Sequence, residues 1–348
     1  MILRKLFLLT VCAGLLGWLG LTAPGAQAEG RTPLSVWFVP TANSPDVGDL
    51  FTKPNQWNHV RSLVDIVGFG PGQLEPAGGS HTSLFSGLVS VDAFRRIKEW
   101  GKDTAIEVPA LKEWDCSALR TPAVTVGLMK AVYAAGGTVQ FLAMDEPLIS
   151  ALGLNRPICK EGLDAAAAKV AAYAHAVMAD PVVLSSGIVP QVIDTEAYPT
   201  LTVQQIEAWI AALERHGFKP AGFHLDADVH AIDVTPNGRK RVVGDLQDLQ
   251  RFLQPEKISF GIMIWSGYDP VSSDEEYYHR TMTWVQTVHN AIGRPDRVVF
   301  ESWVKRCPNS DRGGCGTIGV PMNLPEDGPV AFSHTKLIND AVAVLGGQ

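Results

Sequence analysis

Residues 258–265 read Ile-Ser-Phe-Gly-Ile-Met-Ile-Trp, and a helical pattern follows them over residues 273–291. A strand with one face in water alternates apolar and polar side chains, whereas this run is almost continuously apolar. Such a strand is buried on both faces, which is typical of a parallel sheet covered by helices. The stretch therefore predicts one β-strand and the helix that covers it.

The same unit repeats eight times between residue 34 and the C-terminus. The predicted strands are Leu34–Val39, Val64–Phe69, Thr104–Pro109, Thr138–Met144, Val182–Val192, Ala221–Asp226, Ile258–Trp265 and Arg297–Trp303. The helices are predicted near residues 52–62, 90–101, 121–135, 161–178, 202–216, 243–254, 273–291 and 335–346. This repetition predicts an α/β fold, a single (β/α)8 TIM barrel with long loops at its C-terminal face. A doubly wound open sheet is the main alternative, but no Gly-x-Gly-x-x-Gly follows the first strand.

The composition is typical of a globular protein that does not bind polyanions. The chain has 348 residues, of which 46% are hydrophobic and 19% charged, and its formal net charge is -7. This apolar content can offset the chain entropy and excludes a disordered protein. The acidic excess, 36 Asp and Glu against 29 Lys and Arg, argues against binding to nucleic acid or to an anionic membrane.

The N-terminal residues are typical of a secretory signal peptide. Arg4 and Lys5 precede an apolar run over residues 6–21, and Ala26-Gln27-Ala28 matches a small-x-small cleavage site. A membrane anchor is the alternative, but the run is short for a span. We predict a signal peptide over residues 1–28, a catalytic barrel over residues 29–348, and a secreted or periplasmic protein without a stable membrane anchor.

Four cysteines follow this segment, namely Cys116, Cys159, Cys307 and Cys315. An exported protein meets an oxidising compartment, which favours disulfides. We predict the pair Cys307–Cys315, which closes a short Gly-containing loop, and the pair Cys116–Cys159, which joins two loops on one face of the barrel. Three pairings are open to four cysteines. A zinc site is a further alternative, which the absence of a Cys-x-x-Cys spacing disfavours.

Acidic and aromatic residues gather at the predicted C-terminal ends of the strands, where TIM barrels carry their active sites. Two carboxylates across a cleft can break a glycosidic bond, because one protonates the leaving oxygen while the other attacks the sugar or activates water. Aromatic rings offer flat faces to sugar rings. The candidate catalytic residues are Glu146, Glu301, Glu196 and Asp226. The candidate substrate-binding residues are Trp37, Trp114, Asp145, Asp194, Tyr198, His224, Trp265 and Trp303.

The segment Asp145-Glu146-Pro147 resembles the Asn-Glu-Pro segment of retaining glycoside hydrolases with a (β/α)8 barrel. The resemblance implies that Glu146 is the general acid/base. Two features differ, because Asp145 replaces the Asn and the strand over residues 260–265 has no Glu where the nucleophile would stand. The second carboxylate must then come from another strand, with Glu301 as the first candidate, followed by Glu196 and Asp226.

The segment from His224 to His230 allows a second interpretation. His224, Asp226, Asp228 and His230 would share one face if this stretch stayed extended. Such a cluster could bind zinc and activate water, as in a metal-dependent polysaccharide hydrolase or deacetylase. A third interpretation is a non-catalytic carbohydrate-binding barrel. The principal prediction remains a monomeric glycosidase that acts on an oligo- or polysaccharide and has no cofactor and no nucleic-acid partner.

Overall fold

The computed structural model describes residues 33–74, 84–112, 115–154, 159–307, 315–328 and 332–346. The predicted signal peptide over residues 1–28 lies outside the described residues. None of the helices in the described part of the chain has both the length and the apolar character that a membrane span requires.

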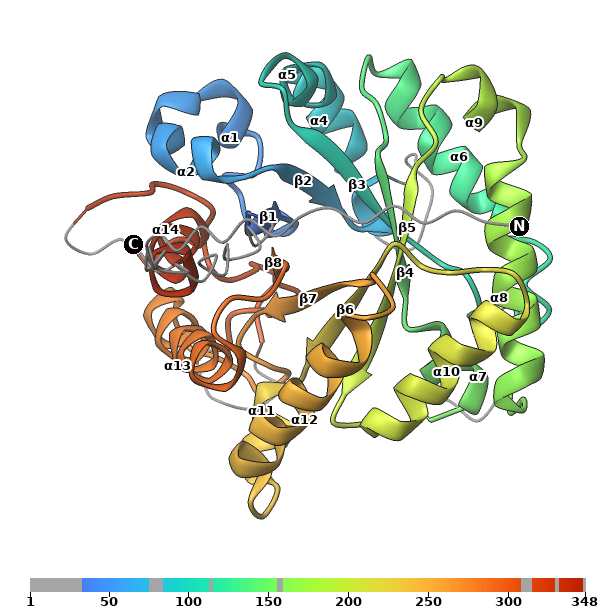
Figure 1. Ribbon diagram of the computed structural model, residues 1–348. Helices are drawn as coiled ribbons and strands as arrows, with labels where there is room; N and C mark the ends of the chain where they lie inside the picture. The colour runs from blue at the N-terminus through green and yellow to red at the C-terminus, as the bar shows by residue number, and fades with distance from the viewer. Residues whose placement is uncertain are drawn as a thin grey trace, which may run out of the picture. The chain divides into compact units, whose positions relative to one another are not determined.

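Eight parallel strands close into a barrel in chain order, and pairing of β8 with β1 completes it. The strands are β1 (Ser35–Phe38), β2 (Ile66–Phe69), β3 (Asp103–Val108), β4 (Phe141–Asp145), β5 (Gln191–Tyr198), β6 (Gly222–Ala227), β7 (Ser259–Ile264) and β8 (Arg297–Phe300). Figure 1 shows the helices arranged around these strands. The structure therefore confirms the predicted single (β/α)8 barrel.

At least one helix follows every strand. The helices are α1 (Asp49–Thr52), the 3-10 helix η1 (Pro54–Trp57), α2 (Asn58–Leu63), α3 (Pro71–Leu74), α4 (Phe85–Ser90), α5 (Ala93–Glu99), α6 (Thr121–Ala134), α7 (Pro147–Leu152), α8 (Leu163–Met178), α9 (Pro181–Ser185), α10 (Val203–Arg215), α11 (Val229–Val234), α12 (Gly238–Leu253), α13 (Asp274–Ile292) and α14 (His334–Gly346). The long ones, such as α8 and α13, are the covering helices that the periodicity predicts.

Helix α10 shows how the sequence forms such a covering helix. Thr202 accepts a hydrogen bond from the Gln205 backbone N–H, and the Gln205 side chain accepts one from the Thr202 backbone N–H, which forms a capping box. Ile206, Ile210 and Leu213 follow at helical spacing and are buried. The cap therefore starts the helix at the point where its apolar stripe can pack on the barrel.

Strand five begins later than the sequence predicts. The prediction places it over Val182–Val192, whereas residues 181–185 form α9 and β5 begins at Gln191. The Asp180 carboxylate accepts a hydrogen bond from the Val182 backbone N–H (2.8 Å), and Pro181 occupies the first helical position. An Asp cap before a Pro starts a helix, which overrides the β-branched residues that follow.

Glycines let large side chains fill the inner part of the barrel. A Cβ atom at Gly261 would lie 2.3 Å from His224 Cδ2, and one at Gly222 would lie 2.5 Å from Arg297 Nη1. The Arg297 guanidinium also packs 5.8 Å from the centre of the Trp37 ring. These side chains close the barrel below its C-terminal opening.

Candidate active site

The barrel opens at the C-terminal ends of its strands into a cavity of about 470 Å³. Its wall is acidic: Glu107 comes from β3, Asp145 from β4 and Asp226 from β6, while Glu301 directly follows β8. Thr195 of β5 also lines the cavity. Strands far apart in the sequence thus bring their carboxyl groups to one opening, at the end where TIM barrels carry active sites.

The alternation of side chains along β5 separates Thr195 from its neighbours. Because Thr195 lines the cavity, Asp194 and Glu196 point to the opposite face of the strand. The Trp209 indole N–H on α10 donates to Asp194 Oδ2 (2.9 Å), and the Leu148 backbone N–H on α7 donates to Glu196 Oε1 (2.6 Å). Both carboxyl groups are fully buried between the barrel and its helices.

Tyr198 points the same way. Its hydroxyl donates a hydrogen bond to Asp245 Oδ2 on α12 (2.5 Å), and its side chain is buried. The prediction that Asp194, Glu196 and Tyr198 lie at the opening is therefore corrected. Their side chains lie between the barrel and its covering helices.

The carboxyl groups of the opening raise one another's pKa. Burial, followed by the charge of Asp145, raises the pKa of Glu107 from 4.5 to about 8, although the Lys112 ammonium opposes the shift. Burial and the charge of Glu107 hold the pKa of Glu301 well above its usual range. At neutral pH the opening therefore retains protons that isolated carboxyl groups would have lost.

Glu146 stands between β4 and α7 with backbone angles of φ 50° and ψ 51°. This is the left-handed region, which few residues other than glycine adopt. Its N–H donates to the Thr195 carbonyl oxygen (3.0 Å), and its carbonyl oxygen accepts from the Ser150 N–H (3.1 Å). Burial raises the pKa of Asp226 well above its usual range, and the Glu146 charge is the next largest cause. The charge of the Glu146 carboxyl group therefore raises the pKa of a carboxyl group in the acidic wall of the opening.

Among the candidate partners, Asp226 is the one for which Glu146 is the strongest neighbouring charge. For Glu301 the strongest neighbouring charge is instead that of Glu107. The Trp265 indole N–H donates to Asp226 Oδ1 (2.8 Å), and this hydrogen bond favours the ionised form of Asp226. Glu146 and Asp226 are thus neighbouring carboxyl groups in unequal surroundings.

The aromatic residues of the opening divide into a buried support and two exposed rings. Trp265 is fully buried, so its predicted role as a sugar-binding face is corrected to that of a support for Asp226. The Trp303 ring lies edge-on to it with centroids 5.3 Å apart, and the Tyr268 ring does so at 4.7 Å. Trp303 is 42% exposed and Tyr268 56% exposed, and both therefore present surface to the solvent.

Two further predicted binding residues lie deep in the cavity. Trp37 and His224 are each 1% exposed, and their rings meet edge to face with centroids 4.8 Å apart. Burial and the Arg297 charge hold the pKa of His224 well below its usual range, so its imidazole is neutral. Trp37 and His224 form the inner end of the cavity, whereas Trp114 lies outside the described residues.

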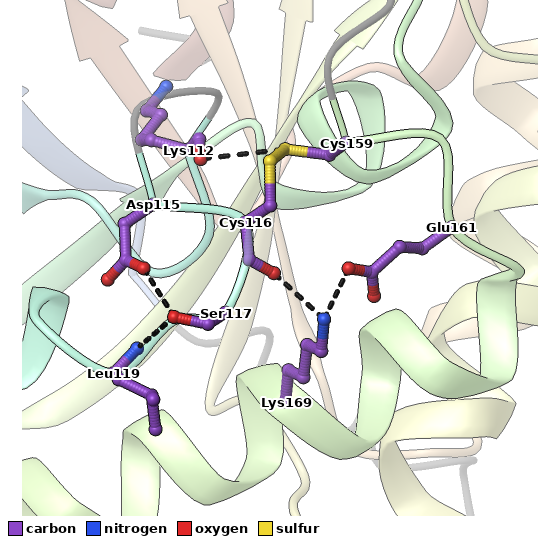
Figure 2. Close-up of a disulfide and its surroundings, with 8 residues drawn as sticks. All are labelled: Lys112, Asp115, Cys116, Ser117, Leu119, Cys159, Glu161 and Lys169. Atoms are coloured by element: carbon purple, nitrogen blue, oxygen red, sulfur yellow. Dashed lines mark hydrogen bonds and ion pairs between the residues drawn. A yellow bond between two sulfur atoms is a disulfide. The ribbon is translucent and has the colours of Figure 1, made fainter.

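Both predicted disulfides are present, Cys116–Cys159 and Cys307–Cys315. Figure 2 shows the first of them, which joins the loop after β3 to the segment before α8. The Lys169 ammonium on α8 donates to the Cys116 carbonyl oxygen (2.8 Å) and pairs with Glu161. The loop after β3 is thereby held against α8.

This same loop brings a positive charge to the acidic opening. The Lys112 carbonyl oxygen lies 3.6 Å from the Cys159 sulfur, and the Lys112 ammonium forms an ion pair with Asp145. Burial disfavours the charged ammonium, but the charges of Asp145 and Glu107 outweigh it and raise the pKa of Lys112. Lys112 therefore stays charged and offsets part of the negative charge of the opening.

The segment after β6 does not gather its acidic and histidine side chains as the metal-site interpretation requires. Asp228 Oδ1 caps α11 by accepting from the His230 and Ala231 backbone N–H groups (3.1 and 3.3 Å). His230 Nδ1 lies 3.7 Å from Asp269 Oδ2, away from the cavity. The described residues contain no cluster of His, Cys, Asp or Glu arranged to hold a metal ion. The chain curls into α11 at Asp228, which breaks the shared face.

Two clefts adjoin the central cavity. One, of about 1230 Å³, reaches Gln73 and shares Glu301 and Trp303 with the cavity. The other, of about 1640 Å³, reaches Leu154 and Tyr268 and again borders Trp303. The exposed Trp303 ring therefore stands where the cavity and both clefts meet.

Glu107 lines the opening, Lys112 pairs with Asp145 there, and Tyr268 lines an adjoining cleft, but none of the three was among the candidates from the sequence. Glu107 had a usable signal, because a carboxyl group that follows the apolar residues Ala105 and Ile106 near the end of a barrel strand is costly unless it serves the opening. Lys112 and Tyr268 lie in loops, and a loop residue's direction depends on the tertiary structure.

No protein family model and no curated protein matches this chain. Among solved structures, active domain 2 of a chitinase from Pyrococcus furiosus is similar with a TM-score of 0.49 and 12% identity, covering 91% of this chain and 98% of that one. An endo-β1,6-glucanase follows with a TM-score of 0.46 and 9% identity, covering 83% and 69%. A 7,8-dihydropteroate synthase from Vibrio fischeri ES114 has a TM-score of 0.40 and 10% identity, covering 77% and 87%.

Likeness at these identities extends to the barrel fold alone, which enzymes of unrelated chemistry share. The fold and the site together define a (β/α)8-barrel protein with a carboxyl-lined opening.

Proposed function

We propose that this protein is a glycoside hydrolase that cleaves an oligo- or polysaccharide with Glu146 and Asp226 as its catalytic pair. The observation that carries the proposal is that the Glu146 charge raises the pKa of Asp226, a carboxyl group that lines the barrel opening. Two neighbouring carboxyl groups resist ionising together and share one proton over a wide pH range. One protonated and one ionised carboxyl group is the state that glycosidic cleavage requires.

The roles are assigned from the hydrogen bond to Asp226 and from the sequence. The Trp265 N–H favours the ionised form of Asp226, and the resemblance of Asp145-Glu146-Pro147 to an acid/base segment supports Glu146 as the group that donates the proton. Glu146 then donates that proton to the glycosidic oxygen, while the Asp226 carboxylate attacks the anomeric carbon or takes a proton from the attacking water. Asp226 thereby replaces Glu301 as the proposed partner, and Glu301 and Glu107 serve as hydrogen-bonding groups for sugar hydroxyls.

The clefts beside the cavity support a saccharide chain as the substrate. Both adjoin the catalytic cavity at Trp303, whose exposed ring offers a flat apolar face to a sugar. The acidic wall disfavours uronic or sulfated sugars, because like charges brought together in a site cost binding energy. A neutral or basic saccharide chain is therefore the proposed substrate class.

Export to an oxidising compartment is also part of the proposal. Two disulfides suggest such a compartment, because thiols are kept reduced in the cytosol. The N-terminal sequence pattern supports removal of residues 1–28 as a signal peptide.

The test is the Glu146→Gln variant, assayed for release of reducing ends from laminarin, lichenan, xylan, galactomannan and chitosan. We expect its turnover to fall by about 10²–10⁴-fold, the usual contribution of a general acid. Binding to the same polymers in affinity electrophoresis should persist, because the amide retains the shape of the side chain. Glu275→Gln is the matched control, since Glu275 is exposed on α13, and it should keep the wild-type rate.

Full turnover by Glu146→Gln would falsify the assignment of the acid. Binding of a polymer by the wild-type protein without release of reducing ends would instead identify a non-catalytic carbohydrate-binding barrel.

A further inference from the structure

Helix α7 begins in an unusual way. Its N-cap residue is Glu146, whose side chain makes no capping hydrogen bond to the helix. Helices usually begin at Ser, Thr, Asp or Asn, whose short side chains accept hydrogen bonds from the first turn. Pro147 at the first helical position has no N–H, so the first amides that need an acceptor belong to Leu148 and Ile149.

Glu196 of β5 supplies the missing cap from another part of the chain. Its Oε1 accepts from the Leu148 N–H (2.6 Å), and its Oε2 lies within reach of the Ile149 N–H (3.4 Å). The Glu196 side chain is fully buried behind the sheet. The residue before it, Thr195, accepts the Glu146 N–H through its carbonyl oxygen (3.0 Å). Consecutive residues of β5 therefore hold Glu146 and the first turn of α7.

This support matters because the Glu146 backbone is strained. A non-glycine residue in the left-handed region costs conformational free energy and persists only where its surroundings enforce it. The left-handed turn at φ 50° lets the chain leave β4 and enter α7 at once.

We propose that Glu196 is a positioning residue, whose carboxyl group fixes the first turn of α7 and thereby aims Glu146 into the opening. The inference rests on the proposed function. It gives Glu196, a candidate for direct catalysis from the sequence, a role exerted through Glu146.

Asp194 provides a matched comparison on the same buried face of β5. It is as fully buried as Glu196, but its partner is the Trp209 indole on α10 and not α7. Loss of either carboxyl group removes a buried hydrogen bond, which costs stability. Only the loss of Glu196 releases the turn that carries Glu146.

The experiment compares Glu196→Ala, Glu196→Gln and Asp194→Asn by steady-state kinetics on the best polymer of the panel, well below the unfolding temperature of each variant. We expect Glu196→Ala to lower kcat by about 10–100-fold with KM within twofold, because a misaimed acid loses rate and not binding. Glu196→Gln keeps an oxygen acceptor for the Leu148 N–H and should restore kcat to within about threefold of wild type. Asp194→Asn should lower the unfolding temperature without changing kcat.

A readout without turnover separates this inference from the proposed function. Hydrogen exchange of the Leu148 amide and an NMR titration of the Glu146 carboxyl carbon can be measured on a protein that cleaves nothing. We expect faster exchange and a shifted titration midpoint in Glu196→Ala, and neither in Asp194→Asn. If Glu196→Ala leaves kcat and the Glu146 titration as in wild type, or if Asp194→Asn changes them equally, Glu196 only stabilises the fold and the proposal is overturned.

Discussion

Replacement of Glu107 by Gln should make the protein more stable at pH 8 while changing little at pH 5. The folded Glu107 keeps its proton up to a pKa of about 8, whereas the unfolded one loses it near 4.5. The folded state therefore binds more protons in this window, and its stability is present below about pH 4.5 and is lost as the pH rises toward 8. Gln carries no ionisable proton and removes this dependence.

The size of the effect follows from the same shift. At 1.36 kcal/mol per pH unit, ionising Glu107 in the fold costs at most about 5 kcal/mol, of which roughly 3 kcal/mol is felt between pH 5 and 8. We expect a measured difference of about 2 kcal/mol, because relaxation and water penetration lower the cost of ionising a buried group.

The assay is urea unfolding of wild type and Glu107→Gln at about pH 5 and pH 8, followed by tryptophan fluorescence. The variant should gain about 2 kcal/mol relative to wild type between the two pH values, whereas the exposed control Glu275→Gln should gain none. Parallel stability curves for wild type and Glu107→Gln would show that Glu107 is ionised at little cost in the folded protein. The raised pKa in the opening would then be refuted.

Two further predictions concern the supports of the site. Trp265→Phe removes the hydrogen bond to Asp226 (2.8 Å), so it should cost about 1–3 kcal/mol and move the acidic limb of the kcat/KM profile to higher pH. Trp284→Phe, which removes a buried hydrogen bond to the Met263 carbonyl oxygen (3.0 Å), should cost similar stability, and an equal change of its pH profile would contradict the role of Trp265. Replacing both Cys116 and Cys159 by Ser removes a disulfide between cysteines 43 residues apart, and loop entropy predicts a loss of about 4 kcal/mol in the free energy of unfolding. The same replacement of Cys307 and Cys315, which are 8 residues apart, should cost about 2.5 kcal/mol. Equal or reversed losses in urea unfolding would indicate that native contacts around the disulfides, and not loop entropy, dominate their effect.

The order of residues along the chain is enough to predict the barrel and the end of the barrel that holds the acidic residues. Continuous apolar strands alternating with amphipathic helices have few ways to bury their surfaces, and a closed parallel barrel satisfies all eight units at once. The carboxyl ends of parallel strands all lie at one edge, which is why the positions of Asp226 and Glu301 along the chain already assign them to the same opening.

Which side of each strand a carboxyl group occupies depends instead on how the strands pack together. An alternating strand reveals its inner face, but β5 is apolar or buried on both faces, so the sequence does not distinguish Thr195 from Asp194 and Glu196. A shift of the strand by one residue would turn the side chains that face the cavity toward the helix layer, and those that face the helices toward the cavity. For the same reason the neighbours that raise the pKa of Glu107 and Asp226 come from several different strands and loops. Their charges act through space, and the order of residues along the chain carries no record of those distances.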